Sequence, residues 1–306
     1  MGKIAFVFSG QGAQYSGMGK ELYDMGAAMK KLYDEAESFR PGTMDMSFNG
    51  SQDDLKITSN TQPCLYLVDL ASALALNENG IYADGCAGFS LGEIAALAYA
   101  GAYTYFDGFK IVTSRGKLMQ SAAEKHDTAM CAVLKKDAET VKKVVSEFEE
   151  LYAVNFNSPG QTVVSGLKKS VDEFSAKMKA DGARCVPLAV SAAFHSPFMN
   201  DASASFAEEL KKYDIKKPDI DVYANLNASP YGDNVTETLA MQMKSPVEWQ
   251  KTIENMIADG YTKFIEVGAG KTLSGLIKKI SGEVKIYSVQ DKESLEKTVE
   301  AVKNND

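Results

Sequence analysis

The chain has 306 residues, of which 45% are hydrophobic, and a formal net charge of −8. This length and composition are typical of a globular protein whose core can support two structural units. The negative net charge argues against a nucleic-acid-binding surface. No apolar run approaches the roughly 20 residues that cross a bilayer, so we expect no membrane association.

The cysteines are widely scattered and form neither a disulfide framework nor a paired metal motif. They are Cys64, Cys86, Cys131 and Cys185. Residues 3–8 begin an apolar strand pattern at once, with no export signal before it. We therefore expect a cytoplasmic protein without a metal site.

Although the net charge is negative, Lys-Lys pairs occur at 135/136, 142/143, 168/169, 211/212, 216/217 and 278/279. Several fall on predicted helices, where a solvated helix face is the ordinary interpretation. The alternative is a local docking patch for an acidic partner.

The first part of the chain predicts α/β order. After the strand at 3–8 come a glycine-rich loop and helices, then a short strand before Gly88, a helix at 91–99 and a helix at 107–123. The polar stretch 41–60 is interpreted as loops around short helical turns.

The middle of the chain has a different pattern. Strands are predicted at 130–134, 151–155, 162–166 and 185–190, and helices at 138–149 and 171–180. This β-α-β-β-α-β order is the ferredoxin-like signature, and Asn157-Ser158-Pro159-Gly160 supplies the turn between its middle strands.

After Pro197 the alternation of helices and strands resumes, ending with a strand at 264–267, a helix at 273–280, a strand at 284–289 and a last helix. We therefore expect two domains. A ferredoxin-like small domain at 127–193 is inserted into a larger, discontinuous domain formed by residues 1–126 and 194–306.

A candidate nucleophile lies in Gly88-Phe89-Ser90-Leu91-Gly92, between a short apolar strand and an apolar helix. Glycines that flank a serine at such a turn relieve crowding in a strained backbone that projects Oγ. The first helical N–H groups then point at an oxygen bound near the serine. The pattern is short enough to occur by chance, so a simple turn is the alternative.

A serine nucleophile needs a base, and the chain has only two histidines. His126 lies in a charged stretch and is interpreted as a surface residue. His195 lies in a run of apolar and small residues where the chain re-enters the large domain. We therefore expect His195 to be the base of Ser90.

The base should in turn be oriented by an acceptor, which is usually a carboxylate. The candidate aspartates between Ser90 and His195 are Asp107, Asp127, Asp137, Asp172 and Asp181. Each is interpreted as a helix cap or a surface residue. A backbone carbonyl that orients the histidine is the alternative.

Two other glycine-rich segments have distinct interpretations. Gly10 and Gly12 bracket Gln11 after the first strand, so the Gln11 amide could join an oxyanion site, with a plain turn as the alternative. The segment 267–272 lacks the spacing of a phosphate loop, and we interpret it as a turn with Thr272 as N-cap.

Arg115 lies on the predicted helix after the serine helix. A lone helical arginine is usually a surface residue. If Arg115 faces inward, its planar guanidinium suits a bidentate interaction with a substrate carboxylate.

Five motifs in order resemble the malonyl-CoA:acyl carrier protein transacylase family over essentially the whole chain. They are Phe8-Ser9-Gly10-Gln11-Gly12, Gly88-Phe89-Ser90-Leu91-Gly92-Glu93, Ser114-Arg115-Gly116, Ala193-Phe194-His195-Ser196 and Ser245-Pro246-Val247-x-Trp249. The resemblance implies an α/β-hydrolase-like large domain with an inserted ferredoxin-like domain. It implies no cofactor, since the coenzyme A thioester is a substrate.

The resemblance also implies a role for each site residue. Ser90 takes the malonyl group, His195 acts as base and then acid, and Arg115 pairs with the malonyl carboxylate. The backbone amides of Gln11 and Leu91 hold the oxyanion. The region of Gln242 offers a backbone carbonyl to His195. The partners implied are malonyl-CoA and acyl carrier protein, and we expect a monomer.

The chain departs from the family pattern at three positions. Phe89 stands where the family commonly has histidine, and Ser9 and Ala269 stand where it has proline. The phenylalanine at position 194 resembles the residue found there in family members that select malonyl over branched acyl groups.

Three alternatives stay open on the sequence. They are a polyketide-type acyltransferase, an ester or thioester hydrolase with the same Ser/His dyad, and a silent module that only binds acyl carrier protein.

Overall fold

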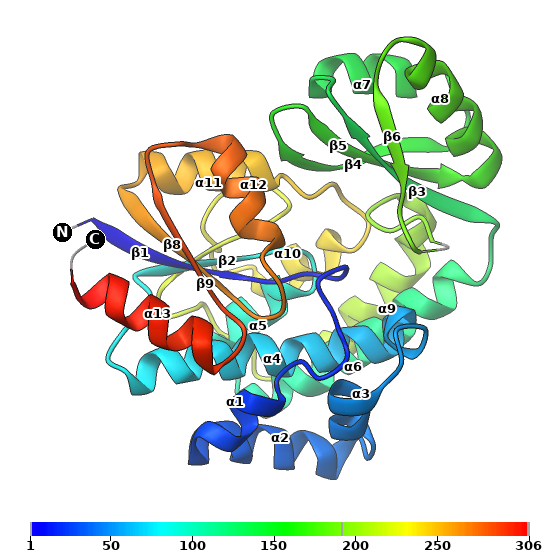
Figure 1. Cartoon of the computed structure of the whole chain (residues 1–306). Coiled ribbons are helices and arrows are strands. Elements are labelled where there is room, and N and C mark those ends of the chain that lie inside the picture. The colour runs from blue at the N-terminus through cyan, green and yellow to red at the C-terminus, as the bar shows by residue number, and fades with distance from the viewer. Residues whose placement is uncertain (1, 191, 305–306) are drawn as a thin grey trace.

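The computed structural model describes residues 2–190 and 192–304, and these residues form a mixed α/β fold with two β-sheets (Figure 1). Residue 191 of the predicted small domain and residues 1 and 305–306 of the large one lie outside the described residues. The first sheet is parallel, in the order β7-β2-β1-β8-β9. Its strands are β1 (Lys3–Phe8), β2 (Gly85–Gly88), β7 (Asp221–Tyr223), β8 (Tyr261–Val267) and β9 (Lys285–Val289).

The central strand β1 is buried on both faces because its apolar residues do not alternate with polar ones. Phe6 and Phe8 pack into one hydrophobic cluster, whereas Ala5 and Val7 pack into another. The register pairs Phe8 with Gly88, so the carboxyl ends of β1 and β2 lie side by side. The loops that follow both strands therefore meet at one edge of the sheet.

Helices cover both faces of this sheet, as Figure 1 shows. On one face lie α11 (Trp249–Ala258) and α12 (Thr272–Ile280). On the other lie α4 (Thr58–Glu78), α5 (Gly92–Tyr99), α6 (Tyr105–Ala123) and α13 (Lys292–Lys303). The remaining large-unit elements are α1 (Lys20–Met25), α2 (Ala27–Phe39), α3 (Thr43–Asn49), η1 (Asp54–Lys56), η2 (Pro197–Met199), α9 (Asn200–Leu210) and α10 (Val235–Gln242).

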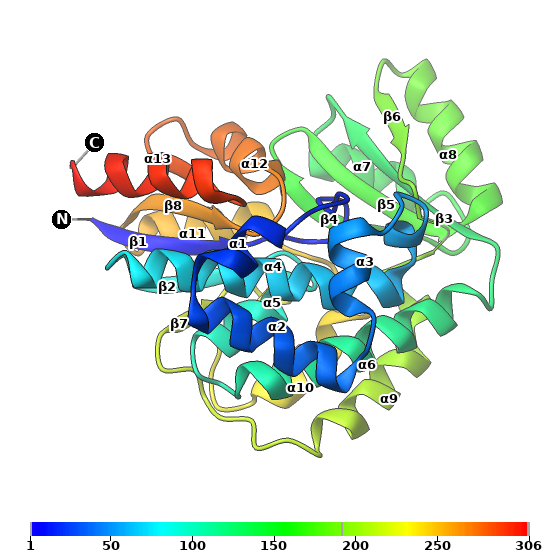
Figure 2. The same cartoon turned by 60° about the horizontal axis from the view of Figure 1, so that its bottom comes forward.

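The second sheet is antiparallel, in the order β4-β5-β3-β6. Its strands are β3 (Thr128–Leu134), β4 (Leu151–Ser158), β5 (Gln161–Leu167) and β6 (Arg184–Pro187), with helices α7 (Ala138–Val145) and α8 (Lys168–Ala180). The chain order is therefore β-α-β-β-α-β, as expected. Figure 2 shows this sheet at the opposite end of the molecule from the start of β1 and the end of α13.

The two faces of β3 have different partners. Cys131 and Val133 pack in the cluster formed with α7 and α8, whereas Met130 and Ala132 belong to the large hydrophobic cluster. Val247 joins the two units, because its N–H donates to Val154 O at 2.8 Å and its carbonyl accepts from Phe156 N at 2.9 Å. The inner face of the small sheet thus closes over the carboxyl edge of the large one.

Two local expectations are wrong. Thr272 is the first residue of α12 and makes no side-chain cap. Glu266 fills that role, since its carboxylate accepts from the N–H groups of Leu273 and Ser274 at 3.0 and 2.7 Å. The helix predicted at 138–149 ends at Val145, and the chain turns away so that Phe148 packs edge-on against Phe174.

Gly92 offers a test of the close approach between β1 and α5. A Cβ at Gly92 would lie 2.3 Å from Phe8 O and 2.5 Å from Ser9 O. We expect Gly92→Ala to lower the free energy of unfolding by about 2 kcal/mol or more in urea titration. Gly275→Ala is the control, because its Cβ meets nothing within 4 Å. Helix propensity predicts that this change stabilises by up to about 1 kcal/mol. Equal effects of the two substitutions would contradict the packing argument.

Candidate active site

A cavity of about 480 Å³ lies between the carboxyl edge of the parallel sheet and the inner face of the small sheet. Gln11, Ser90, Arg115 and His195 line it from the large unit, and Met130 lines it from β3. The structure therefore brings together site residues that are separated by up to 184 positions in the chain. This arrangement follows the rule that parallel sheets place their sites at the carboxyl ends of strands.

The turn from β2 to α5 holds Ser90 in a strained conformation. Its φ is 54°, in the left-handed region that non-glycine residues seldom adopt. The flanking glycines make this turn possible. A Cβ at Gly88 would lie 2.0 Å from Gly92 C, and a Cβ at Gly92 would lie 2.3 Å from Phe8 O, so neither position tolerates a side chain. Strain of this kind is typical of functional residues.

Ser90 and His195 form a hydrogen-bonded pair. Ser90 Oγ lies 2.8 Å from His195 Nε2, and His195 Nδ1 lies 3.0 Å from the backbone oxygen of Gln242. Because a carbonyl oxygen can only accept, Nδ1 carries the proton and Nε2 is left to accept from the serine hydroxyl. The neutral tautomer needed for a general base is therefore the one that the fold selects.

The acceptor behind His195 is a carbonyl and not a carboxylate. Gln242 ends α10, so its carbonyl has no partner within the helix and is free to accept from the imidazole. None of the five aspartates between Ser90 and His195 takes this place. Asp137, for example, caps α7, where it accepts from Thr140 N at 2.8 Å.

Burial, together with the positive charge of Arg115, lowers the pKa of His195 to about 4. The imidazole is 4% exposed, so water stabilises its protonated form poorly. The hydrogen bond to Gln242 acts in the opposite direction, because it favours the cation. At neutral pH the imidazole is therefore neutral and able to accept a proton.

Arg115 faces inward from α6 and is completely buried. One amino group, Nη2, donates to Ser90 Oγ at 3.1 Å and to Gln242 Oε1 at 2.8 Å. The other, Nη1, donates to Gln62 Oε1 at 2.9 Å. Burial lowers its pKa to about 10 while the charge of Glu93 opposes that shift, so the guanidinium stays charged at neutral pH.

The direct partners of Arg115 are neutral oxygens. Within residues 2–190 and 192–304 no carboxylate lies within 4.0 Å of its guanidinium nitrogens, and its Nε has no hydrogen-bond partner. A buried cation without a contacting anion is costly, so the site favours a ligand that brings a negative charge.

Two backbone amides are available to an oxyanion. In the part of the chain that the structure describes, neither the Gln11 nor the Leu91 N–H has a hydrogen-bond partner. Both residues line the cavity that contains Ser90. The Gln11 side chain is held away from its own amide, since its Nε2 donates to Thr58 Oγ1 at 3.2 Å.

Ser9 anchors the start of the Gln11 loop to helix α4. Its hydroxyl donates to Asp69 Oδ1 at 2.6 Å, and Asp69 is fully buried in α4. Burial raises the pKa of Asp69 well above its ordinary value, with a smaller contribution from Glu266. A proline at position 9 could not make this hydrogen bond, so Ser9 and Asp69 form a polar anchor that is tied to this departure from the family pattern.

Phe89 forms part of the cavity wall and packs on the only tryptophan. The Phe89 and Trp249 ring centroids lie 5.4 Å apart in an edge-on arrangement. Phe194 lines the same cavity and is 7% exposed. Both aromatic rings therefore restrict the space beside Ser90.

Two residues of this site escaped the sequence prediction. Gln62 contacts Arg115, and the side chain of Asn225 contacts the Ser90 N–H. Gln242, which the resemblance placed near His195, also contacts the Ser90 carbonyl through its side chain. Gln62 had a detectable signal, because a glutamine that precedes Pro63 inside an apolar helix is unusual. Asn225 had no detectable signal in the sequence, because the composition of its loop is ordinary and only the fold places it next to Ser90.

Other charged candidates lie outside the site. His126 is exposed, as expected, and its ring contacts Phe198. Many lysines of the Lys-Lys pairs form ion pairs with carboxylates on their own helices, for example Lys142 with Glu139 and Lys168 with Asp172. For these lysines the solvated helix face is the better interpretation.

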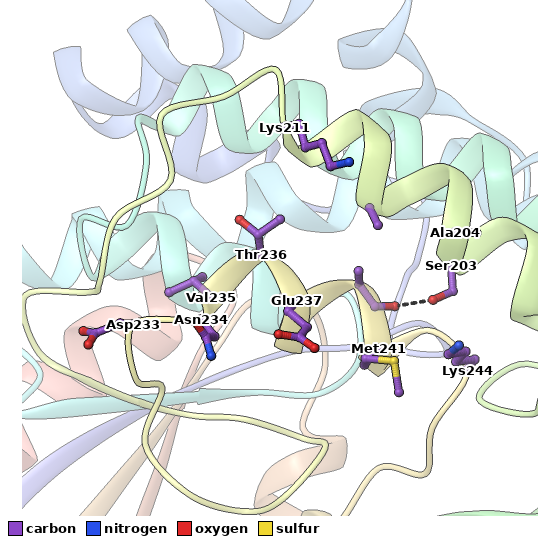
Figure 3. A pocket seen from close by; sticks show the side chains of 12 residues that line it. Ser203, Ala204, Lys211, Asp233, Asn234, Val235, Thr236, Glu237, Met241 and Lys244 are labelled. Carbon is purple, nitrogen blue, oxygen red and sulfur yellow. Dashed lines mark hydrogen bonds between the residues drawn. The ribbon is translucent and has the colours of Figure 1, made fainter.

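A second hollow, of about 510 Å³, lies between α9 and α10 (Figure 3). Its lining includes Ser203, Lys211, Glu237 and Met241. None of the predicted site residues lines it, although Gln242 follows Met241 in the same helix. The groups that could perform chemistry therefore meet in the other cavity.

Metal sites and membrane spans are both absent from the described residues. No cluster of three or more His, Cys, Asp or Glu among them could hold a metal ion. None of the described helices combines the length and apolar character of a bilayer span.

Comparison with known proteins identifies the class. The chain belongs to the acyl transferase domain family, which matches residues 5–294. Among its relatives, the malonyl CoA-acyl carrier protein transacylase of Bacillus subtilis (strain 168) is 40% identical, and the match covers 99% of this chain and 98% of that protein. The resemblance based on five motifs is thereby confirmed.

Solved structures agree with this assignment. The malonyl CoA-acyl carrier protein transacylase of Clostridium perfringens superimposes with a TM-score of 0.95 at 36% identity, covering 99% of this chain and 98% of that one. A malonyl-transacylase in complex with its type II PKS acyl-carrier protein gives 0.93 at 31% identity, with coverages of 97% and 99%.

The depressed pKa of His195 predicts an unusual pH profile. Because the folded-state pKa is about 4, the imidazole stays neutral as the pH falls through its ordinary range. We expect kcat/KM for acylation to stay within about twofold from about pH 8 to about pH 5, and to fall tenfold per unit only below the pKa. Rapid-quench acylation, with circular dichroism as the folding control, measures this. An apparent pKa near 6.5 would contradict the buried, neutral histidine.

Proposed function

We propose that this protein transfers the malonyl group from malonyl-CoA to the phosphopantetheine thiol of acyl carrier protein, through a malonyl-serine intermediate, and so supplies fatty acid elongation. The observation that carries the proposal is the buried Arg115 guanidinium, which lies 3.1 Å from Ser90 Oγ and has no contacting anion in the described part of the chain. A carboxylate close to the reacting carbonyl, as in a malonyl group, would complete this pair. The named relatives support the same activity.

In the first half-reaction, Ser90 Oγ attacks the thioester carbon while His195 Nε2 accepts the hydroxyl proton. The carbonyl oxygen becomes an oxyanion, which the free amides of Gln11 and Leu91 stabilise. When the intermediate collapses, the C–S bond breaks and His195 returns the proton to the coenzyme A sulfur. The malonyl ester of Ser90 remains.

In the second half-reaction the thiol of the carrier protein takes the place of coenzyme A. His195 accepts the thiol proton, the sulfur attacks the ester carbon, and the proton returns to Ser90 Oγ. This is a ping-pong cycle in which one oxyanion site serves both halves. Arg115 holds the malonyl carboxylate throughout and limits the orientations of the acyl group.

Burial of the acyl-enzyme is what distinguishes transfer from hydrolysis. Phe89 and Phe194 narrow the space beside Ser90, which limits access of water to the ester. The similarity to a malonyl-transacylase solved in complex with a type II PKS acyl-carrier protein keeps polyketide supply as a second candidate. The same site chemistry would serve both pathways.

We further propose an α/β-hydrolase-like large domain, residues 1–126 and 194–306, and a ferredoxin-like small domain, residues 127–193. The parallel sheet and the β-α-β-β-α-β order support these names. We propose a monomer that uses no bound cofactor. A reducing, cytoplasmic location is supported by the four cysteines, all free and buried.

A covalent intermediate is the direct test. We expect incubation with malonyl-CoA to add one malonyl mass to the intact protein, and the adduct to persist until carrier protein or coenzyme A is added. Ser90→Ala should show no adduct. Rapid discharge by water alone would favour a hydrolase, and absence of an adduct on the unmodified protein would favour a silent binding module.

Arg115→Ala tests the choice of acyl group. Loss of the cation leaves the malonyl carboxylate buried without a partner, so we expect the malonyl-to-acetyl ratio of kcat/KM to fall by roughly 100-fold. Lys117→Ala is the matched control, because Lys117 is an exposed cation on the same helix. An unchanged ratio in Arg115→Ala would remove Arg115 from substrate recognition.

A further inference from the structure

Asn225 contacts the backbone on both sides of Phe89, immediately before the strained serine. It lies two residues beyond β7, which pairs with β2, so the register brings it beside the turn that carries Ser90. Its Oδ1 accepts from Ser90 N at 2.8 Å, and its Nδ2 donates to Gly88 O at 2.6 Å. One buried amide thus spans the two peptide groups that flank Phe89.

These two hydrogen bonds hold the backbone next to the strained conformation of Ser90. The φ of Ser90, 54°, is unfavourable in an L-residue, so the turn must be held by its surroundings. The Ser90 N–H points to Asn225, while the Ser90 carbonyl accepts from Gln242 Nε2 at 2.7 Å. Both polar groups of the Ser90 backbone are therefore fixed by side chains from the C-terminal half.

Asn225 is itself held by a buried carboxyl group. Its backbone N–H donates to Glu93 Oε2 at 2.6 Å, and the hydroxyl of Tyr231 donates to the other oxygen, Oε1. Asn225 and Glu93 are fully buried. Burial raises the pKa of Glu93 to about 7, and the hydrogen bonds from Tyr231 and Asn225 and the charge of Arg115 oppose that rise.

We propose that Asn225, held in place by Glu93 and Tyr231, is a positioning residue that locks the Ser90 turn so that Oγ faces His195 and the Leu91 amide faces the oxyanion. The proposal rests on the proposed function of Ser90 as nucleophile. It also explains why the Ser90 N–H does not serve the oxyanion, because Asn225 already occupies it. The free Leu91 amide, next in the chain, is left for that task.

The test compares three variants by rapid-quench acylation with malonyl-CoA. We expect Asn225→Ala to lower the acylation rate constant by roughly 100-fold, the effect of a displacement of about 1 Å, while KM changes by less than about threefold. Asn79→Ala is the matched control. It removes one side-chain hydrogen bond, from Asn79 Nδ2 to Ala75 O at 2.9 Å at the C-terminal end of α4, where neither residue lines the cavity, and should leave the rate unchanged.

Asn225→Asp separates positioning from folding. The carboxylate keeps the acceptor for Ser90 N but lacks the donor for Gly88 O, and protonation restores that donor. Among the described residues, Glu93 accepts from the Asn225 N–H and Tyr231 donates to Glu93, whose pKa the charge of Arg115 also lowers. The backbone N–H of Glu248 donates to Asn225 O at 2.9 Å. We expect the rate of Asn225→Asp, relative to the unmodified protein, to rise as the pH falls, whereas the ratio for Asn225→Ala stays constant.

The outcomes are distinct. If the unmodified protein forms no malonyl adduct, the proposed function fails. If it does, and Asn225→Ala acylates within about threefold of it, the positioning role is wrong while the function stands. If Asn225→Ala unfolds, the Asp variant decides. If the acylation rate of Asn225→Asp is lowered equally at every pH, the positioning role of Asn225 is wrong. If the rate recovers as the pH falls, the positioning role is supported.

Discussion

The left-handed backbone of Ser90 is the constraint on which the rest of the site depends. A turn this tight requires glycine on both sides, and it places Oγ in the cavity while exposing the Leu91 amide. A strained turn relaxes unless its polar groups are held. Here Asn225 binds the Ser90 N–H and Gln242 binds the Ser90 carbonyl, so two distant segments maintain the geometry.

Gln242 connects this mechanical constraint to the electrostatics of the site. Its backbone carbonyl selects the His195 tautomer, and its side chain accepts from Arg115 and donates to Ser90. Burial of His195, and then the charge of the nearby guanidinium, depress the pKa of His195, which keeps the base neutral. One residue at the end of α10 thus aligns the nucleophile, the base and the cation, and a carboxylate behind the histidine is not required for that alignment.

The order of strands and helices was predicted well from the spacing of apolar residues, because that spacing reflects which face of each element is buried. The β-α-β-β-α-β order at 128–187 is an example. Errors arose where tertiary contacts overrode local preference. The distant carboxylate of Glu266 caps α12 in place of Thr272, and Phe148 ends α7 early by packing on Phe174.

The sequence nominated Ser90, His195, Gln11 and Arg115 because the residue types in their local motifs indicate chemistry, and the family resemblance added Leu91 and the region of Gln242. It also identified the family. Only the tertiary structure showed that Arg115 faces inward with no contacting anion among the described residues, and that the Asn225 side chain bonds the Ser90 N–H. The physical reason is that direction, burial and partner identity depend on contacts between segments that lie far apart in the chain, which no local pattern contains.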